Sequence, residues 1–291
     1  AMAGRAEGRV QTLARHLAAS NPANTVGLCS VSPDFCRGVE NGTRGVCLVV
    51  GVGPGIGGAV AKRFLLEGYD VVVCRRNADK LKDDVRRIRT EAESEGMGRN
   101  LPSLTGLPLD ARLEDQVVAV VEKTERDVGP LEIVVFNVGA NVPDSVLTET
   151  ARKFRKVWEM ACFSGFLVSR EAAKHMLPRG HGTIIFTGAT ASLRGNNGFA
   201  AFGSAKAGLR SLAQSMAREV QPQGLHVCHV IIDGPVDTPP TREFFGGLLA
   251  SKAKDEFLQP DAVAASYFHL HCQERAAWTH ELDVRPYLEK W

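Results

Sequence analysis

The sequence predicts a single domain with three layers, α/β/α, built on a doubly wound parallel β-sheet. From Val46 onward, short apolar strand-like runs alternate with amphipathic helical stretches. Strands that alternate with helices indicate a parallel sheet covered on both faces. The crossover connections in such a sheet are right-handed, which is typical of a doubly wound fold. The length of 291 residues suits one large α/β domain, and a hydrophobic fraction of 44% is ordinary for a folded globular chain.

Six apolar runs are expected to form most of this sheet. They lie at residues 47–51, 71–74, 104–109, 132–136, 182–187 and 226–232. The helical stretches that separate them lie at about 56–67, 78–94, 113–127, 151–177 and 200–220. A short final strand at 281–284 is expected to extend the sheet near the C-terminus.

A glycine-rich turn joins the first predicted strand to the first predicted helix. Gly51 allows a tight exit from the strand, Gly55 allows close approach of a pyrophosphate, and Gly57 lets the helix pack closely. The helix that opens at Ile56 presents free N–H groups and a partial positive charge to an anion. Such a turn can also be an ordinary connection, but the strand before it and the helix after it favour a Rossmann-type dinucleotide site.

The end of the second predicted strand bears on the choice of cofactor. In an NAD site of this type, a carboxylate about 20 residues beyond the glycines binds the ribose hydroxyls. Here that place is occupied by Cys74, Arg75 and Arg76. Because a guanidinium binds phosphate with two hydrogen bonds, we predict NADP(H) over NAD(H). The alternative is a solvated basic helix, since five further cations follow at Lys80, Lys82, Arg86, Arg87 and Arg89. A solvated helix accounts well for the five later cations. It accounts less well for Arg75, which lies at the carboxyl end of the strand, where ligands bind in such sheets.

These motifs together resemble the short-chain dehydrogenase/reductase family, over roughly Val46 to the C-terminus. The family's Gly-x-x-x-Gly-x-Gly motif matches the three glycines above, and its adenine-side aspartate matches Asp110. Its Asn-Ala-Gly motif resembles the segment from Asn137 to Gly139. The resemblance implies an oxidoreductase with a small-molecule substrate that forms homodimers or homotetramers through the helices at 151–177 and 200–220.

The resemblance extends to the second half of the chain. The family's active-site lysine matches Lys206, which by this resemblance hydrogen bonds the nicotinamide ribose. The family's Pro-Gly turn appears as Asp233-Gly234 and is followed by Val236 and Thr238. In the family these residues lie against the nicotinamide.

Three of the family's four catalytic positions carry other residues. The family uses Asn, Ser, Tyr and Lys, and the corresponding positions here are Cys162, Ala189, Phe202 and Lys206. Phe202 has no hydroxyl and cannot transfer a proton. Since a positioned general acid or base contributes about 10²–10⁴-fold to a rate, ordinary ketone chemistry should be impaired while cofactor binding survives.

Two hypotheses follow from this pattern. The first is an NADP(H)-dependent oxidoreductase with altered acid chemistry, in which the proton comes from water or from a side chain such as Thr190, Ser192 or Cys162. Carbonyls and activated double bonds of the enone or enoyl type are the expected substrates. The second is a catalytically inactive NADP(H)-binding sensor or assembly protein.

The segment at 239–257 stands where the family carries its substrate-covering loop. Its apolar residues predict an apolar pocket and a lipophilic or acyl-type substrate, unless they simply pack on the core. These residues are Phe244, Phe245, Leu248 and Leu249, with Gly246-Gly247 as a hinge.

Charge and cysteine content exclude several other classes. The net charge of +2 gives no support for a nucleic-acid partner, and no apolar run approaches the ~20 residues of a membrane-spanning helix. The seven cysteines are scattered without metal-ligand spacing, so we expect no metal site and a reducing compartment. No histidine has a catalytic context, and His226 and His229 are expected to be structural.

Residues 1–44 are expected to be an N-terminal extension of the domain at 45–291. Arg5, Arg9 and Arg15 lie in a segment poor in acids, as in an organellar import sequence. The other interpretation is an N-terminal helix that packs on the domain of a cytoplasmic protein.

Overall fold

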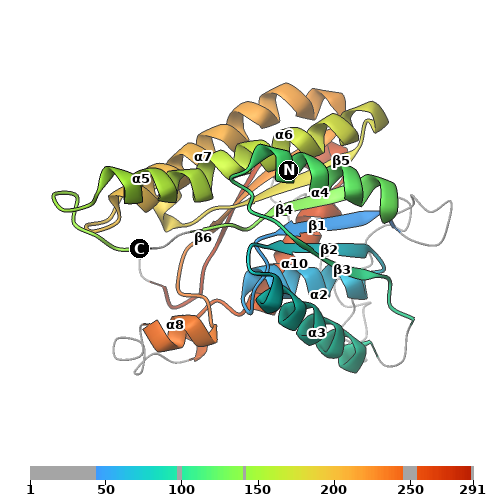
Figure 1. Ribbon diagram of the computed structural model, residues 1–291, viewed down its shortest axis with the longest axis horizontal. Helices are drawn as coiled ribbons and strands as arrows, with labels where there is room; N and C mark the ends of the chain where they lie inside the picture. The colour runs from blue at the N-terminus through green and yellow to red at the C-terminus, as the bar shows by residue number, and fades with distance from the viewer. Residues whose placement is uncertain (1–43, 97–99, 140–141, 245–253, 290–291) are drawn as a thin grey trace, which may run out of the picture. The chain divides into compact units, whose positions relative to one another are not determined.

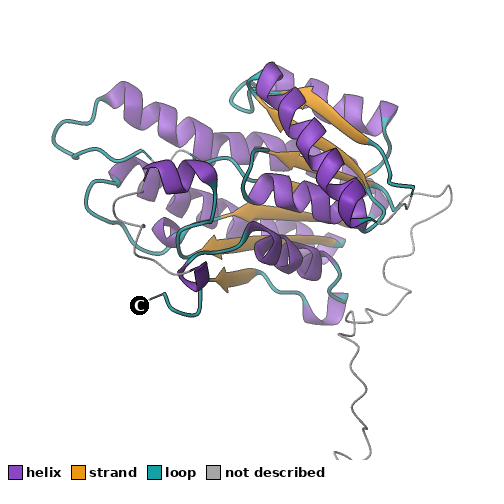
Figure 2. Cartoon of the chain, turned by 90° about the horizontal axis from the view of Figure 1, so that it is seen from below, coloured by secondary structure: helices purple, strands orange, loops and turns teal. Residues whose placement is uncertain are grey.

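The computed structural model describes residues 44–96, 100–139, 142–244 and 254–289. Its centre is a sheet of seven strands in the order β3-β2-β1-β4-β5-β6-β7, and every neighbouring pair is parallel. The strands are β1 (Val46–Val50), β2 (Asp70–Arg75), β3 (Leu104–Pro108), β4 (Leu131–Phe136), β5 (Gly182–Thr187), β6 (Leu225–Ile232) and β7 (Glu281–Val284). Figure 2 shows them fanned out as one twisted sheet. The predicted doubly wound sheet is confirmed, and its strand order reverses between β1 and β4.

Helices cover the sheet on both faces, as predicted (Figure 1). One layer holds α2 (Ile56–Leu66), α3 (Ala78–Glu95) and α10 (Pro260–His271). The other holds α4 (Glu114–Asp127), α6 (Ser164–Met176) and α7 (Ala200–Val220), with α5 (Ala151–Trp158) leading into α6. Because both faces are covered, the central strands are apolar throughout, and every residue of β1 is buried.

The predicted helix at 151–177 is interrupted. Between α5 and α6, a π-helical turn spans Glu159–Phe163, and the backbone N–H of Ser164 bonds the carbonyl of Glu159, five residues back. The Ser164 hydroxyl adds a bond of 2.5 Å to the carbonyl of Met160. The amphipathic pattern at 151–177 predicted one continuous helix and did not reveal the π turn. Such turns occur frequently at functional sites, and this one carries Cys162.

Two of the described helices were not predicted, α10 and the short α8 (Pro239–Phe244). α10 begins with proline at its first position, where the missing N–H costs nothing. Its last residue, His271, is buried, and the ring shares hydrogen bonds of 2.9 Å with Tyr69 and with Thr183. The interpretation of the strand histidines as structural is also supported, because His226 contacts the carbonyl of Thr279 and His229 contacts Glu281.

Several expectations fall outside the part of the chain that is described. The predicted extension at 1–44 is outside it except for Arg44, and so are Phe245, Leu248, Leu249 and the Gly246-Gly247 hinge, as well as the side chain of Phe244. None of the described helices is both long and apolar enough to cross a membrane.

Candidate cofactor site and active site

A cavity of about 600 Å³ opens at the carboxyl ends of the strands, where the strand order reverses. In open α/β sheets this is the place where ligands bind. Six of the residues predicted to bind a cofactor line the cavity: Gly51, Arg75, Arg76, Asp110, Asn137 and Gly139. Sequence motifs far apart in the chain are thus brought together by the ends of β1, β2, β3 and β4.

The glycine turn leaves β1 in a conformation that only glycine adopts readily. Gly51 has φ +100°, and a Cβ atom there would lie 2.6 Å from the carbonyl oxygen of Asn137. A Cβ atom on Gly57 would lie 2.4 Å from the carbonyl oxygen of Gly51. The side-chain amide of Asn137 in turn donates to that same oxygen at 2.9 Å. The backbone of the glycine turn therefore packs directly against the backbone of α2 and of the residue that follows β4.

The start of α2 offers unpaired amides. Gly55 is the N-cap, and its carbonyl accepts from the N–H groups of Gly58 and Ala59 at 3.1 Å. The N–H groups of Ile56 and Gly57 make no backbone hydrogen bond to any described residue. Unpaired amides at the positive end of a helix dipole suit an anion such as a pyrophosphate. Thr238 borders this turn, since a Cβ atom on Gly55 would lie 2.9 Å from its Cγ2.

The two arginines after β2 differ in their partners. Arg75 lines the cavity, but its guanidinium is bonded to the buried carboxylate of Asp84. Arg76 also lines the cavity, is exposed, and has no hydrogen bond or ion pair to any described residue. The cation that is free to meet a phosphate is therefore Arg76, whereas the sequence favoured Arg75.

Asp110 carries a partner that the sequence analysis did not single out. Arg112 donates from Nε to Oδ1 of Asp110 at 2.9 Å and from a terminal nitrogen to Oδ2 at 2.5 Å. These bonds lower the pKa of Asp110, so the carboxylate is ionised at neutral pH. Arg112 lines the cavity too. The only sequence signal for it is its position two residues after the predicted aspartate.

Lys206 lies buried on α7 near the end of β4. Its Nζ donates to the carbonyl of Thr187 at 2.8 Å and to that of Val138 at 3.2 Å. Burial lowers its pKa to about 8, because water no longer solvates the ammonium. A Cβ atom on Gly139 would lie 3.9 Å from this nitrogen, so the two predicted residues are neighbours.

The other predicted tetrad positions surround this lysine. The ring of Phe202, one helical turn earlier on α7, has its centroid 5.9 Å from Nζ of Lys206. Cys162 is 8% exposed and lies against Gly208. Burial raises the pKa of its thiol, while Lys206 lowers it by a smaller amount. Ala189 follows β5 and donates its N–H to Ser192 at 3.1 Å.

The hydroxyls proposed as replacement acids differ in how their protons are used. Thr190 donates to the carboxylate of Asp233, so its proton is engaged. Ser192 accepts from the backbone N–H of Ala189 and donates to no described residue, so its proton is available. Cys162 lies close enough to Lys206 for the ammonium to lower the pKa of its thiol, but burial raises that pKa by more.

The other residues predicted to bind a cofactor do not line the 600 Å³ cavity: Gly55, Ile56, Gly57, Lys206, Gly234, Val236 and Thr238. Gly234 has φ +148° and faces Pro286, which lies 2.7 Å from the position of an added Cβ atom. Val236 forms an isolated bridge with Leu258, and Thr238 bonds Thr241 at 2.8 Å. Thr238 borders Gly55, so this segment follows on from the glycine turn rather than from the cavity.

Comparison with known proteins identifies the class. The family "short chain dehydrogenase" matches residues 45–246, so the chain belongs to the short-chain dehydrogenase family of oxidoreductases. A curated relative, 2-dehydro-3-deoxy-D-gluconate 5-dehydrogenase of Formosa agariphila, is 33% identical over 174 residues, which are 60% of this chain and 63% of the relative. The match therefore spans less than two thirds of that relative.

Two solved structures show the same fold. A short-chain dehydrogenase from Rhodopseudomonas palustris is 44% identical, with a TM-score of 0.69 over 84% of this chain and 99% of that chain. A single-site variant of actinorhodin polyketide ketoreductase with NADPH is 24% identical, with a TM-score of 0.73 over 84% of this chain and 97% of that chain. The doubly wound, nucleotide-binding fold predicted from the sequence is thereby confirmed.

Proposed function

We propose that this chain is an NADP(H)-dependent oxidoreductase that transfers hydride to or from a small, apolar carbonyl, enone or enoyl substrate with altered acid chemistry. The observation that carries the proposal is the glycine turn. Gly51 and Val52 line the cavity at the sheet's switch point, and the amides of Ile56 and Gly57, a few residues further along the turn, make no backbone hydrogen bond to any described residue. A nicotinamide cofactor supplies the hydride when bound, and the protein binds and orients.

The residues around the cavity fit such a cofactor. The amides at the start of α2 would hold the pyrophosphate, and Asp110 and Arg112, which line the cavity, would border the adenine. Lys206 would hydrogen bond the nicotinamide ribose with the third N–H of its ammonium, because its two backbone carbonyl partners use only two of the three donors. The preference for NADP(H) rests on Arg75 and Arg76, which stand where an NAD site carries its carboxylate.

The proton side of the proposed reaction rests on the predicted tetrad positions. Phe202 brings an apolar ring to the position of the family's phenol, 5.9 Å from the lysine. A ketone would therefore find no tyrosine hydroxyl there. An activated carbon–carbon double bond is a better substrate, because its proton is added to carbon and water can deliver it.

The second candidate function is an inactive NADP(H)-binding sensor or assembly protein. The combined change at Cys162, Ala189 and Phe202 favours it, since the chain keeps residues suited to binding a cofactor but lacks three of the family's four catalytic residues.

Exposed aromatic residues support self-association for either candidate function. Phe154, Trp158 and Phe166 lie on α5 and α6 with 37–39% of their surface exposed, which favours a homodimer or homotetramer through these helices.

A substrate screen tests the proposal. The protein is loaded with NADPH, and carbonyls, enones and enoyl thioesters are screened for loss of NADPH absorbance. Turnover of any class that disappears in Lys206→Ala supports the enzyme. Tight NADPH binding without turnover across the panel supports the sensor, and absence of NADPH binding refutes both.

A further inference from the structure

The glycine-rich turn contains five glycines between residues 51 and 58: Gly51, Gly53, Gly55, Gly57 and Gly58. Because glycine has the widest choice of backbone conformations, such a turn loses much entropy when it is fixed around a ligand. A turn of this composition is organised only if groups outside it hold its backbone. Asn137 does so at one end, through its bond to the carbonyl of Gly51.

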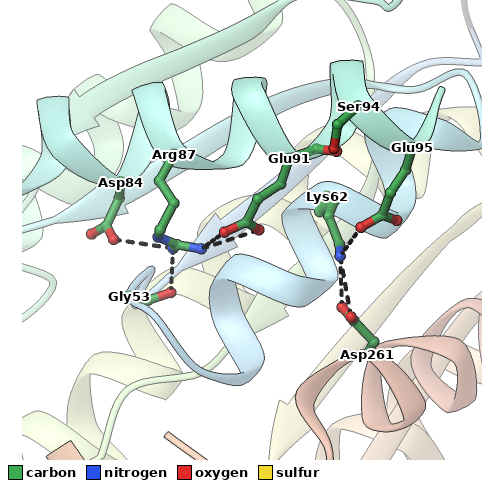
Figure 3. Close-up of polar contacts among 8 residues, drawn as sticks. All are labelled: Gly53, Lys62, Asp84, Arg87, Glu91, Ser94, Glu95 and Asp261. Atoms are coloured by element: carbon green, nitrogen blue, oxygen red, sulfur yellow. Dashed lines mark hydrogen bonds and ion pairs between the residues drawn. The ribbon is translucent and has the colours of Figure 1, made fainter. Parts of the chain in front are cut away.

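A second side chain holds the middle of the turn. Arg87, on α3, donates from its guanidinium to the carbonyl oxygen of Gly53 at 3.0 Å (Figure 3). The peptide that follows joins Gly53 to Pro54 and has no N–H, so the carbonyl is its only polar group. This one bond therefore fixes the orientation of the peptide, with its oxygen on the side of α3.

The Arg87 side chain is itself held in place. Its nitrogens also lie 3.2 Å from Oδ1 of Asp84 and 3.2 Å from Oε1 of Glu91, on the same helix. Asp84 is only 5% exposed, and its other oxygen accepts from Arg75. Figure 3 shows Arg87 extending from α3 to the turn between these two carboxylates. A guanidinium with acceptors on three sides loses little further freedom when it bonds the turn.

Gly58 supports this contact from the other side. A Cβ atom there would lie 2.4 Å from the carbonyl oxygen of Gly53 and 2.7 Å from a terminal nitrogen of Arg87. Gly58 is not part of the spaced glycine motif that matches the family. Its lack of a side chain is explained by the room that the Arg87–Gly53 bond needs.

We propose that Arg87 is a positioning residue for dinucleotide binding. By holding the Gly53 carbonyl against α3, it keeps the turn in the form that leaves the amides of Ile56 and Gly57 free for the pyrophosphate. The inference rests on the proposed dinucleotide binding, and it adds a residue that neither lines the cavity nor belongs to the predicted ligand contacts. Preorganisation of this kind raises affinity by reducing the ordering cost of binding.

Arg86 provides a matched control on the same helix. It is the neighbouring residue with the same charge, but its side chain is 78% exposed and pairs with Asp83, whereas the side chain of Arg87 is 32% exposed. Arg86→Gln and Arg87→Gln therefore remove the same charge from the same helix, and only the second removes the bond to the turn.

The test is calorimetric binding of ADP, NADH and NADPH to the full chain. Arg87→Gln is expected to weaken all three by about tenfold and by the same factor, because all three share the pyrophosphate. The ratio of NADPH to NADH affinity should stay within about twofold of wild type, since the 2′-phosphate is bound elsewhere. Arg87→Lys should recover part of the loss, and Arg86→Gln should bind as wild type does.

A ligand-free measurement completes the test. Hydrogen exchange of the amides at 53–59 should be faster in Arg87→Gln than in Arg86→Gln, while exchange in β4 and β5 stays the same. If Arg87→Gln fails to fold, Gly58→Ala disturbs the same contact and should weaken ADP equally. Unchanged ADP affinity in a folded Arg87→Gln or Gly58→Ala protein would overturn the inference. A wild-type protein that binds ADP without preferring NADPH would instead refute the proposed cofactor choice alone.

Discussion

The two halves of the candidate site are built in contrasting ways. At the glycine-turn end, polar groups are numerous and linked, with Arg75, Asp84 and Arg87 forming a continuous set of ion pairs beside the turn. At the Lys206 end, the lysine bonds backbone carbonyls, and Phe202 packs with an apolar cluster that includes Cys162. One end presents the groups that binding requires, whereas the other presents no hydroxyl at the predicted tetrad positions.

This contrast separates two demands of nucleotide-dependent redox chemistry. Binding a dinucleotide needs backbone amides, glycines and cations, and these depend on the fold of the strand–turn–helix unit. Proton transfer needs side-chain acids at a few positions, and these can change without affecting the fold.

The largest expected effect comes from installing the proton-transfer groups. Phe202→Tyr combined with Ala189→Ser should raise NADPH-dependent reduction of simple ketones by about 10²–10⁴-fold over the parent protein. The new phenol would stand one helical turn from Lys206, which is already buried with its pKa lowered to about 8. Initial rates on a ketone panel measure the gain, with Phe202→Leu as the apolar control. Rates equal to that control would mean that the pocket has diverged as well as the acid.

At the opposite end, adding one carbon to the turn should abolish tight binding. A Cβ atom on Gly57 would lie 2.4 Å from the carbonyl oxygen of Gly51, and neither backbone can move without shifting the start of α2. We expect Gly57→Ala to weaken NADPH binding by about hundredfold, because the turn or the start of α2 must shift to admit the added carbon. Gly53→Ala is the control, because nothing lies within 4 Å of its added carbon. Equal affinities for the two variants in a fluorescence titration would contradict the packing argument.

The buried lysine predicts a specific pH dependence. Its pKa is about 8 in the folded protein, and it is about 10.4 in an unfolded chain, so the unfolded state binds more protons between these values. The contribution of Lys206 to the free energy of unfolding therefore rises with pH in this window, by up to about 1.4 kcal/mol per pH unit. Below about pH 8 both states are protonated and the contribution is flat. Lys206→Met should lose this slope, whereas Lys80→Met, on the exposed start of α3, should keep it.

Denaturation series of wild type and each variant measure this slope, from about pH 7 to about pH 11 so that both pKa values are bracketed. A difference between two proteins is needed because burial raises the pKa of Cys47, Cys74 and Cys228, so these thiols lower stability over the same pH range. Their contribution is common to both proteins and cancels. Parallel curves for wild type and Lys206→Met would show that the ammonium is not desolvated.

The sequence predicted the strands well because each buried strand is a continuous apolar run. The strand–turn–helix pattern also predicted the glycine turn, whereas Asp110, Asn137 and Lys206 were assigned through the resemblance to the family's motifs, and their roles stay predictions. The sequence did not separate Arg87 from the other cations of α3. The usable signal was Asp84, which falls on the buried stripe of that helix and therefore needs a cationic partner. Pairing of this kind depends on which side chains meet in space.

The two arginines after β2 give the smallest expected effect and the finest comparison at the binding end. Arg76 has no ion-pair partner in the described chain, so Arg76→Ala breaks no ion pair and tests its proposed contact with a 2′-phosphate. Arg75 is already bonded to Asp84, and its charge is largely neutralised there. We expect Arg76→Ala to weaken NADPH binding about tenfold with NADH binding unchanged. Arg75→Ala should weaken NADPH binding by a smaller factor, because the carboxylate of Asp84 already neutralises much of the Arg75 charge.

Titrations of Arg75→Ala and Arg76→Ala with both cofactors measure the two ratios of NADPH to NADH affinity. A larger change of this ratio in Arg75→Ala than in Arg76→Ala would mean that the 2′-phosphate displaces Asp84 from Arg75. Arg75 could make the main contact with the phosphate only after its guanidinium had left that carboxylate. Equal affinity of the wild type for NADPH and NADH would show that neither arginine binds a 2′-phosphate. The contrast between the two ends of the site would then rest on the glycine turn alone.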